Sequence, residues 1–282
     1  MTYAICPVST APVRNTSSHK SEMISQLLFG ELVEVLELKG RQWVKVRCCD
    51  DNFVGWVSSN QLEIITPSEY EIYRDNFAFV FDFFHPAHAN SHFMPLMVGC
   101  RLPNFDGIQF TIGENTFNFS GRAVYPQDAK RDPEILVKLA KMYLNVPFLW
   151  GGRSAMGIDA PGFVQVVCRM SGIQLPREAE EQIYSGDNVE FIDHALPGDL
   201  AYFENTRGRI THVGILLKDK QVIHAYGKVR IDDIDHFGIF NQELKRYTHK
   251  LRLIKRIFSP KQESKNDAAI KSVGEATQIE LF

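Results

Sequence analysis

The feature that most constrains this chain is a glycine-rich turn that leads into an apolar helix near its middle. Three glycines precede Asp159, and Pro161 and an apolar run up to Val167 follow it. Asp is a good N-cap residue, and Pro suits the first helical turn because its missing N–H is not needed there. We therefore expect a helix over residues 160–170 whose first side chain, that of Ala160, faces a cleft. Such a helix start favours a thiolate or another anion, but an alanine supplies no chemistry.

This stretch resembles the nucleophile motif of the NlpC/P60 family, which comprises papain-like cysteine peptidases that cut bacterial cell-wall peptides. The family reads roughly Tyr-Leu-Trp-Gly-Gly, a spacer, and then Gly-Ile-Asp-Cys-Ser-Gly-Phe. Here residues 148–152 read Phe-Leu-Trp-Gly-Gly, and residues 157–163 read Gly-Ile-Asp-Ala-Pro-Gly-Phe. Two later segments resemble the strand of the family's general base, at His212, and the strand of the residue that orients this base, at His224. The resemblance implies the γ-D-glutamyl-L-diamino acid endopeptidase type with N-terminal bacterial SH3 domains.

Several positions around this one cleft depart from the family's pattern. Ala160 stands where the family has its nucleophilic Cys, and Pro161 stands where a Ser follows it. Phe148 replaces a Tyr, Tyr226 replaces a small residue, and Glu178 replaces the Asp that contacts the free amine of the substrate in close relatives. Loss of a nucleophile removes several orders of magnitude of rate. We therefore expect an inactive homologue.

The resemblance also implies roles for residues of the cleft. A Cys at the position of Ala160 would be ionised by His212, and His224 would orient that imidazole. The residues implied to contact a peptide are Phe148, Trp150, Asp159, Pro161, Arg177, Glu178 and Tyr226. No metal ion and no cofactor is implied. Cys168 is not a substitute nucleophile, because it lies two helical turns beyond Ala160 among apolar residues, which raise the pKa of a thiol.

Three functions are compatible with these residues. The first is an inactive homologue that binds a cell-wall peptide, such as an L-Ala-γ-D-Glu-diamino acid fragment, without cutting it. The second is an active cysteine peptidase, in which an unforeseen nucleophile acts or Ala160 has replaced an original Cys. The third is an interaction module whose SH3-like barrels bind a protein partner while the cleft is idle. The pair His212 and His224 fits a retained ligand site and a structural, half-buried pair equally well.

Residues 1–66 are predicted to form a small β-barrel. Alternating apolar and polar residues at 31–37 and 43–48 are typical of half-buried strands. The segment resembles a bacterial SH3 domain of the kind attached to NlpC/P60 peptidases. Trp43 and Trp56 are interpreted as core or rim aromatics of this barrel rather than as ligand platforms.

Residues 67–126 give a weaker signal. A dense aromatic run begins at Phe77, and hairpin-like turns follow it. Multi-domain relatives have a second, degenerate SH3-like barrel at this place, and we expect one here. His85, His88 and His92 lie in what we interpret as a loop, and we expect no metal site there because no carboxylate or Cys joins them.

Residues 127–259 are expected to form the NlpC/P60 domain. Asp132 and Pro133 mark the start of a helix. Strands are predicted over residues 199–203, 211–217 and 221–224. Helices packed on one side of an antiparallel sheet make this domain α+β. The resemblance implies that it is papain-like and that two SH3-like barrels precede it. Residues 260–282 are polar and are expected to be disordered.

The composition excludes several kinds of partner. The net charge of −3 and the pI near 6.3 give no broad basic field for nucleic acid or an anionic membrane. No stretch approaches the roughly 20 apolar residues of a membrane span, and the start of the chain lacks the basic and apolar regions of a signal peptide. The five cysteines have no metal-binding spacing, so we expect free thiols and a cytoplasmic location.

Overall fold

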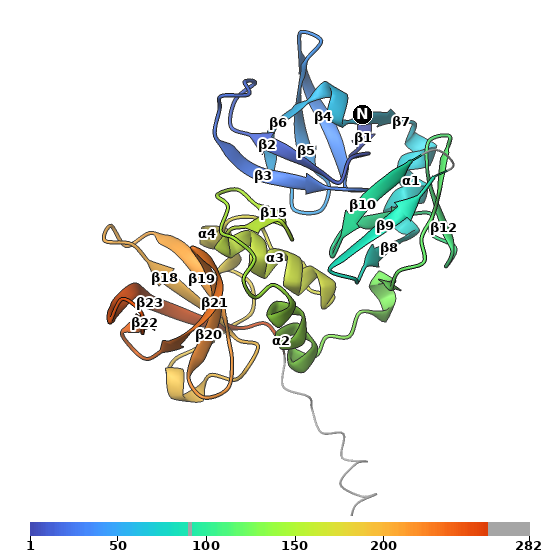
Figure 1. The fold of residues 1–282 in the computed structure, drawn as a ribbon. Helices are drawn as coiled ribbons and strands as arrows, with labels where there is room; N and C mark the ends of the chain where they lie inside the picture. The colour runs from blue at the N-terminus through green and yellow to red at the C-terminus, as the bar shows by residue number, and fades with distance from the viewer. Residues whose placement is uncertain (90–91, 259–282) are drawn as a thin grey trace, which may run out of the picture.

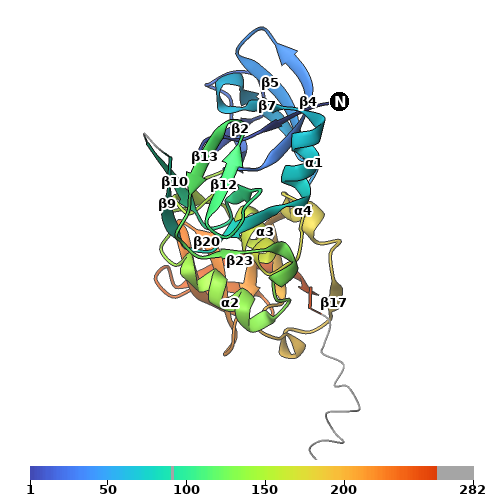
Figure 2. The ribbon, with the colours of Figure 1, turned by 90° about the vertical axis from the view of Figure 1, so that its right-hand side faces the viewer.

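The computed structural model describes residues 1–89 and 92–258. Figures 1 and 2 show one group of strands at each end of the molecule, with helix α3 (Ala160–Met170) between them. The N-terminal strands β1–β7 are drawn in blue, and the C-terminal strands β18–β23 are drawn in orange to red. The prediction for residues 260–282 lies outside the described residues. Within the described ranges, no helix has the length and apolar character of a membrane span.

The N-terminal sheet has seven strands in the order β3-β2-β6-β5-β4-β1-β7. The strands are β1 (Thr2–Ile5), β2 (Thr10–Arg14), β3 (Met23–Leu28), β4 (Leu32–Lys39), β5 (Trp43–Cys48), β6 (Val54–Ser58) and β7 (Glu63–Ile65). Each neighbouring pair is antiparallel. Trp43 is buried, whereas Trp56 lies half-buried with the ammonium groups of Lys39 and Lys45 about 6 Å from its ring centre. These positions agree with the interpretation of both side chains as core and rim aromatics.

The segment after this sheet begins with helix α1 (Pro67–Asp75), which the sequence analysis did not predict. Thr66 and Glu69 form a capping box at its start. Two small sheets follow, with the orders β11-β8-β14 and β10-β9-β13-β12. Their strands are β8 (Phe77–Val80), β9 (Phe84–His88), β10 (Phe93–Met97), β11 (Arg101–Pro103), β12 (Gln109–Ile112), β13 (Asn115–Asn118) and β14 (Ala123–Val124).

The interpretation as a loop is wrong for His85 and His88. His85 and His88 lie on β9, which pairs with β10 in an antiparallel hairpin. Pro86 and Pro95 face each other across this hairpin, and prolines lower the strand propensity of the sequence. The backbone pairing therefore outweighs the local signal.

Two helices precede the C-terminal sheet. Helix α2 (Pro133–Met142) begins as predicted, with the Asp132 side chain accepting a hydrogen bond from the backbone of Glu134. Helix α3 runs from Ala160 to Met170, as predicted, and packs against α2 and against strands β19 and β20 of the C-terminal sheet. The short strands β15 (Arg153–Ser154) and β16 (Gly157–Ile158) and the short helix α4 (Ala179–Gln182) flank it.

The C-terminal sheet has the order β17-β23-β18-β19-β20-β21-β22, and β22 also pairs with β23. Its strands are β17 (Asp187–Val189), β18 (Leu200–Glu204), β19 (Ile210–Leu216), β20 (Gln221–Tyr226), β21 (Lys228–Ile234), β22 (Gly238–Asn241) and β23 (Arg246–Arg256). The three strands predicted here are present, with boundaries that differ by one or two residues. Each pairing is antiparallel.

Buried ion pairs join the N-terminal sheet to the region around α3. The carboxylate of Glu31 accepts hydrogen bonds from Arg153 at 2.9 and 3.0 Å and also pairs with Arg169. All three side chains are at most 5% exposed. Although burial opposes it, the two guanidinium groups hold the pKa of Glu31 at about 2. The N-terminal sheet is therefore fixed against the helix that carries Ala160.

Candidate active-site pocket

The start of α3 is built around the carboxylate of Asp159. One oxygen accepts the backbone N–H of Gly162 at 2.8 Å, and the other accepts the backbone N–H of Gly151 at 2.9 Å. The second oxygen also accepts a hydrogen bond from the guanidinium of Arg177 at 2.6 Å. Asp159 therefore caps the helix and fixes the glycine-rich turn at the same time. Ala160 follows this cap and is buried at the edge of a pocket.

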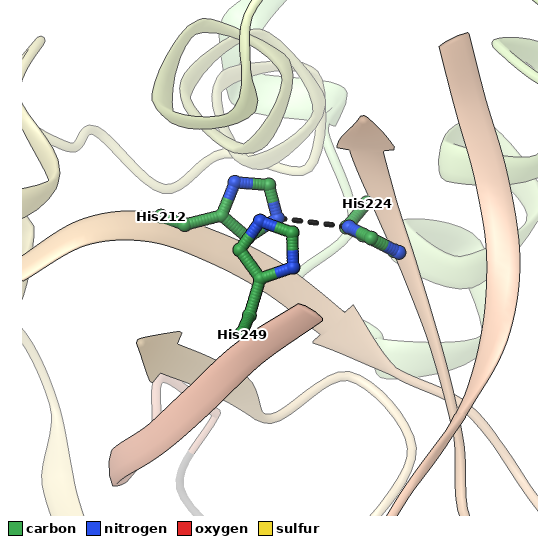
Figure 3. Close-up of side chains that lie close together, drawn as sticks. All are labelled: His212, His224 and His249. Carbon is green, nitrogen blue, oxygen red and sulfur yellow. Dashed lines mark hydrogen bonds between the residues drawn. The ribbon is translucent and has the colours of Figure 1, made fainter. Parts of the chain in front are cut away.

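Two buried histidines from neighbouring strands face each other beside α3. Nε2 of His212, on β19, lies 2.8 Å from Nδ1 of His224, on β20 (Figure 3). Nε2 of His224 in turn lies 3.0 Å from a carboxylate oxygen of Asp232 on β21. The guanidinium of Arg230 makes two hydrogen bonds to the same carboxylate, at 2.7 and 2.9 Å.

This chain of contacts fixes the tautomers of both neutral rings. Burial raises the pKa of Asp232, but the hydrogen bonds from His224 and Arg230 outweigh it and hold this pKa below its usual value. The carboxylate is therefore ionised and accepts a hydrogen bond from an N–H of His224. Nε2 of His224 is then the donor, and its Nδ1 accepts from Nε2–H of His212. The remaining nitrogen of His212, Nδ1, is left as an acceptor. This is the tautomer that a general base requires.

A third histidine, His249, joins this pair from strand β23. Its ring stacks on His212 with the ring centres 4.0 Å apart and an interplanar angle of 22°, and it meets His224 edge-on. The sequence analysis missed His249, because the residue lies in a strand that matches no motif. One imidazole nitrogen from each of the three residues lies within 4.8 Å of the other two.

Burial keeps all three imidazoles neutral near pH 7. It lowers the pKa of His212 well below 6.5, and the two neighbouring imidazoles act in the same direction. Burial also lowers the pKa of His224, although the bond to Asp232 opposes this shift. The pKa of His249 falls to about 4, again chiefly through burial.

These side chains face a pocket of about 560 Å³ between the N-terminal sheet and the C-terminal sheet. The pocket is lined by Glu22, Ile24, Phe148, Trp150, Asp159, Ala160, Pro161, Glu178, Ala179, Glu180, Asn205, Arg209, Ile210, Thr211, His212, Ala225, Tyr226 and His249. It thus brings together every peptide-contacting residue predicted from the sequence except Arg177. His224 lies behind His212 with no exposed surface.

Arg177 supports the pocket from outside. Its side chain is 1% exposed and binds the carboxylate of Asp159 and the hydroxyl of Ser25. The carboxylate of Asp159 is itself engaged by two backbone N–H groups and this guanidinium. Both residues were expected to contact a peptide, but their polar atoms are occupied within the protein. The local sequence gave no sign of this, because Ser25 comes from the distant N-terminal sheet.

The N-terminal sheet supplies one wall of the pocket. Glu22 and Ile24 line it, and the indole N–H of Trp150 donates a hydrogen bond to Glu22 at 2.7 Å. Glu178 and Glu180 lie on the α4 side, and partial burial raises the pKa of Glu178. Together with Asp159, four carboxyl side chains therefore line the pocket.

The described residues that line this pocket include no cysteine and no serine. Cys168 is fully buried further along α3, and burial raises the pKa of its thiol, as the sequence predicted. The pocket therefore combines two hydrogen-bonded imidazoles with a helix start whose first side chain, that of Ala160, is a methyl group.

Comparison with known proteins finds matches for two segments of the chain. Residues 145–249 match the NlpC/P60 family, and residues 13–62 match the bacterial dipeptidyl-peptidase SH3 domain. The chain is 28% identical to a gamma-D-glutamyl-L-lysine dipeptidyl-peptidase of Bacillus subtilis, over 71% of each protein. It is 27% identical to a Bacillus cereus protein of the same name, over 74% of this chain and 68% of the relative. A probable endopeptidase NlpC of Escherichia coli is 41% identical over 29% of this chain and 53% of its own length.

Two solved structures share the fold. An NlpC/P60 family protein from Bacillus cereus superposes with a TM-score of 0.78 at 21% identity, over 91% of this chain and 100% of the other. An NlpC/P60 endopeptidase from Photobacterium damselae subsp. piscicida gives a TM-score of 0.68 at 14% identity, over 89% and 70%. The chain therefore carries an NlpC/P60 domain, with a bacterial SH3 domain ahead of it in the sequence.

Proposed function

We propose that this protein binds a cell-wall peptide, such as an L-Ala-γ-D-Glu-diamino acid fragment, and does not cut it. The observation that carries the proposal is Ala160 at the start of α3, in the same pocket as the neutral base His212. Covalent catalysis needs a nucleophile that this base can activate, and a methyl group cannot be activated. His212 lines the pocket and is bonded to His224, and two curated relatives are named gamma-D-glutamyl-L-lysine dipeptidyl-peptidase.

The acidic side chains support recognition of the free amine of such a peptide. Glu22 and Glu178 reach the pocket from opposite walls, and Trp150 holds Glu22 through its indole N–H. A protonated amine forms charge-assisted hydrogen bonds with carboxylates, which are stronger than neutral ones. We therefore place the amino end of the peptide between these two walls, with its scissile bond near Ala160.

We also propose the finer architecture that accompanies this function. Residues 127–259 act as a papain-like domain, with helices packed on one side of an antiparallel sheet. Residues 1–66 and 67–126 act as two SH3-like units, the second of them degenerate. The packing of α3 on β19 and β20 supports the first assignment, and the division of the N-terminal strands into separate sheets supports the second.

Calorimetric titration with the tripeptide L-Ala-γ-D-Glu-L-Lys tests the proposal. We expect one peptide per chain and no free lysine after prolonged incubation. Glu178→Gln should weaken binding about tenfold or more, because it removes a charge-assisted hydrogen bond. Glu181→Gln is the matched control, since Glu181 is exposed nearby and does not line the pocket.

Two outcomes contradict the proposal. Release of free lysine by the unmodified protein establishes an active peptidase with another nucleophile. Absence of any heat with the tripeptide, together with a protein partner that is still captured when the pocket is filled, favours an interaction module instead.

A further inference from the structure

We propose that His212, His224 and His249 form a binding site for a divalent transition-metal ion of the zinc class. Imidazole nitrogen is a preferred ligand of Zn²⁺, and three histidines with one open position are a known ligand set for this ion. The three rings converge from strands β19, β20 and β23 in Figure 3. The proposal concerns a ligand other than the peptide and stands on separate observations.

The first observation is that two of the strands are bulged next to these residues. His212 and Ile210 of β19 pair with Phe203 and Glu204 of β18. Thr211 of β19 is therefore an extra residue. His249 and Tyr247 of β23 pair with Ile239 and Phe240 of β22. Thr248 of β23 is therefore an extra residue. A β-bulge re-aims the adjacent side chain, and such bulges are frequent next to active sites. Each bulge immediately precedes a histidine of the cluster.

The second observation is that the ring nitrogens are already oriented as ligands. Nε2 of His224 is bonded to Asp232, which leaves Nδ1 directed at His212. Metal-ligating histidines commonly donate their other N–H to a carboxylate in this way, which fixes the ring. Nδ1 of His249 is bonded to the Thr248 hydroxyl at 2.9 Å, which leaves its Nε2 available.

The third observation is that the distances require only side-chain adjustment. Two nitrogens on one tetrahedral Zn²⁺ are about 3.3 Å apart, given metal–nitrogen bonds of about 2.0–2.1 Å. Nε2 of His212 and Nδ1 of His224 are 2.8 Å apart, and no pair of ligand atoms in the cluster exceeds 4.8 Å. His249 is the partly exposed member and closes the remaining gap by rotating its ring.

Metal binding replaces the hydrogen bond between His212 and His224. The proton on Nε2 of His212 passes to Nδ1 of the same ring through solvent, and the lone pair on Nε2 then coordinates the ion. Both rings stay neutral, so no net proton is released. Because His212 and His249 line the pocket and His224 lies behind them, the fourth position faces the pocket.

Titration of the full chain with Zn²⁺ alone and with Co²⁺ alone tests this site. We expect one ion per chain and the visible spectrum of a tetrahedral Co²⁺ complex without a thiolate charge-transfer band. His249→Gln should weaken binding at least tenfold. His236→Gln is the matched control and should leave it unchanged, because His236 is exposed and belongs neither to the three-histidine cluster nor to the pocket that the cluster faces.

A second variant separates ligation from a change of fold. Asp232→Asn should weaken Co²⁺ binding about 10- to 100-fold, as loss of a ligand-orienting carboxylate does elsewhere. The proposal is overturned if neither ion binds stoichiometrically, if His249→Gln binds as tightly as the unmodified chain, or if the Co²⁺ spectrum shows thiolate ligation. Tripeptide binding is measured in metal-free buffer, so its outcome is independent of this one.

Discussion

Nε2 of His212 lies 2.8 Å from Nδ1 of His224, and this one contact determines which nitrogen of His212 is free to accept a proton. Asp232 accepts a hydrogen bond from Nε2–H of His224, so Nδ1 of His224 accepts one from Nε2–H of His212. The free lone pair of His212 is therefore on Nδ1. An imidazole nitrogen that can accept a proton therefore shares the pocket with the methyl group of Ala160.

Restoring the nucleophile should restore chemistry. We expect Ala160→Cys together with Pro161→Ser to release lysine from L-Ala-γ-D-Glu-L-Lys, because a thiol at the start of α3 meets both a neutral base and the helix dipole. The rate should exceed that of the unmodified chain by about a thousandfold or more. Free lysine is measured by chromatography of the reaction mixture.

The control adds His212→Gln to the double variant, which should remove the gain. The double variant could bind the tripeptide but release no lysine. This result would mean that Phe148, Glu178 and Tyr226 have altered the position of the scissile bond.

The pH dependence of the free energy of unfolding should show that the buried histidines are neutral in the folded protein. A histidine whose folded pKa is lowered binds fewer protons folded than unfolded, so its stabilising contribution is complete above about pH 6.5 and is lost as the pH falls. For His249 the window runs from 6.5 down to about 4. We expect the free energy of unfolding in urea to fall over this window by up to about 1.4 kcal/mol per pH unit for each such histidine.

The His249→Gln variant should show a shallower slope between pH 6.5 and 4. The effect of Glu31 falls in a different window, because its folded pKa of about 2 lies below the ordinary carboxyl value and its contribution is lost between about 4.5 and 2. An unchanged slope in the His249 variant contradicts the neutral state of that ring.

The helix that carries Ala160 was predictable from the sequence because its signals are local. The Asp159 cap and Pro161 fix its start, and Ser171 ends it as its C-cap. Helix α1 also had a readable signal, the capping box of Thr66 and Glu69, which the sequence analysis passed over. Such local signals act within one turn of a helix and need no tertiary contact.

The rest of the site depends on long-range contacts that one sequence does not display. His249 lies beside a bulge in the pairing of β23 with β22, and β23 also pairs with β18. Arg177 is withdrawn from the pocket because Asp159 and Ser25 bind it, and these two residues come from different parts of the chain. The wall formed by Glu22 likewise requires the docking of the N-terminal sheet.

The close approach of the glycine-rich turn to that sheet gives a further prediction. Gly151 has φ +74°, and a Cβ there would lie 2.4 Å from the backbone oxygen of Met23 on β3. Gly151→Ala should therefore separate the turn from the sheet and weaken tripeptide binding. It should also destabilise the protein by more than the roughly 1–2 kcal/mol expected for a left-handed alanine alone.

Gly208→Ala is the matched control. Gly208 has nearly the same φ, +75°, but a Cβ there meets nothing within 4 Å. It should show only the cost of the backbone conformation. Equal losses of stability in the two variants, measured by urea denaturation, would show that the contact with Met23 is not constraining.

The buried carboxylate of Glu31 should dominate the docking of the two ends of the chain. Glu31→Gln leaves the buried guanidinium of Arg153 without its carboxylate and leaves Arg169 with only the longer ion pair to Asp50 at 3.2 Å. Breaking a buried ion pair on one side costs about 3–5 kcal/mol, because a charge remains buried without its partner.

Glu34→Gln is the control: it removes the partner of Arg47, whose side chain is 44% exposed, and should cost at most about 1 kcal/mol. The two variants are compared by urea denaturation at pH 7. Since Glu22 and Glu31 lie on either side of strand β3, the Glu31 variant should also bind the tripeptide more weakly, whereas the Glu34 variant should bind it unchanged. Similar losses of stability in both would mean that the N-terminal sheet is held to α3 by apolar packing and not by this carboxylate.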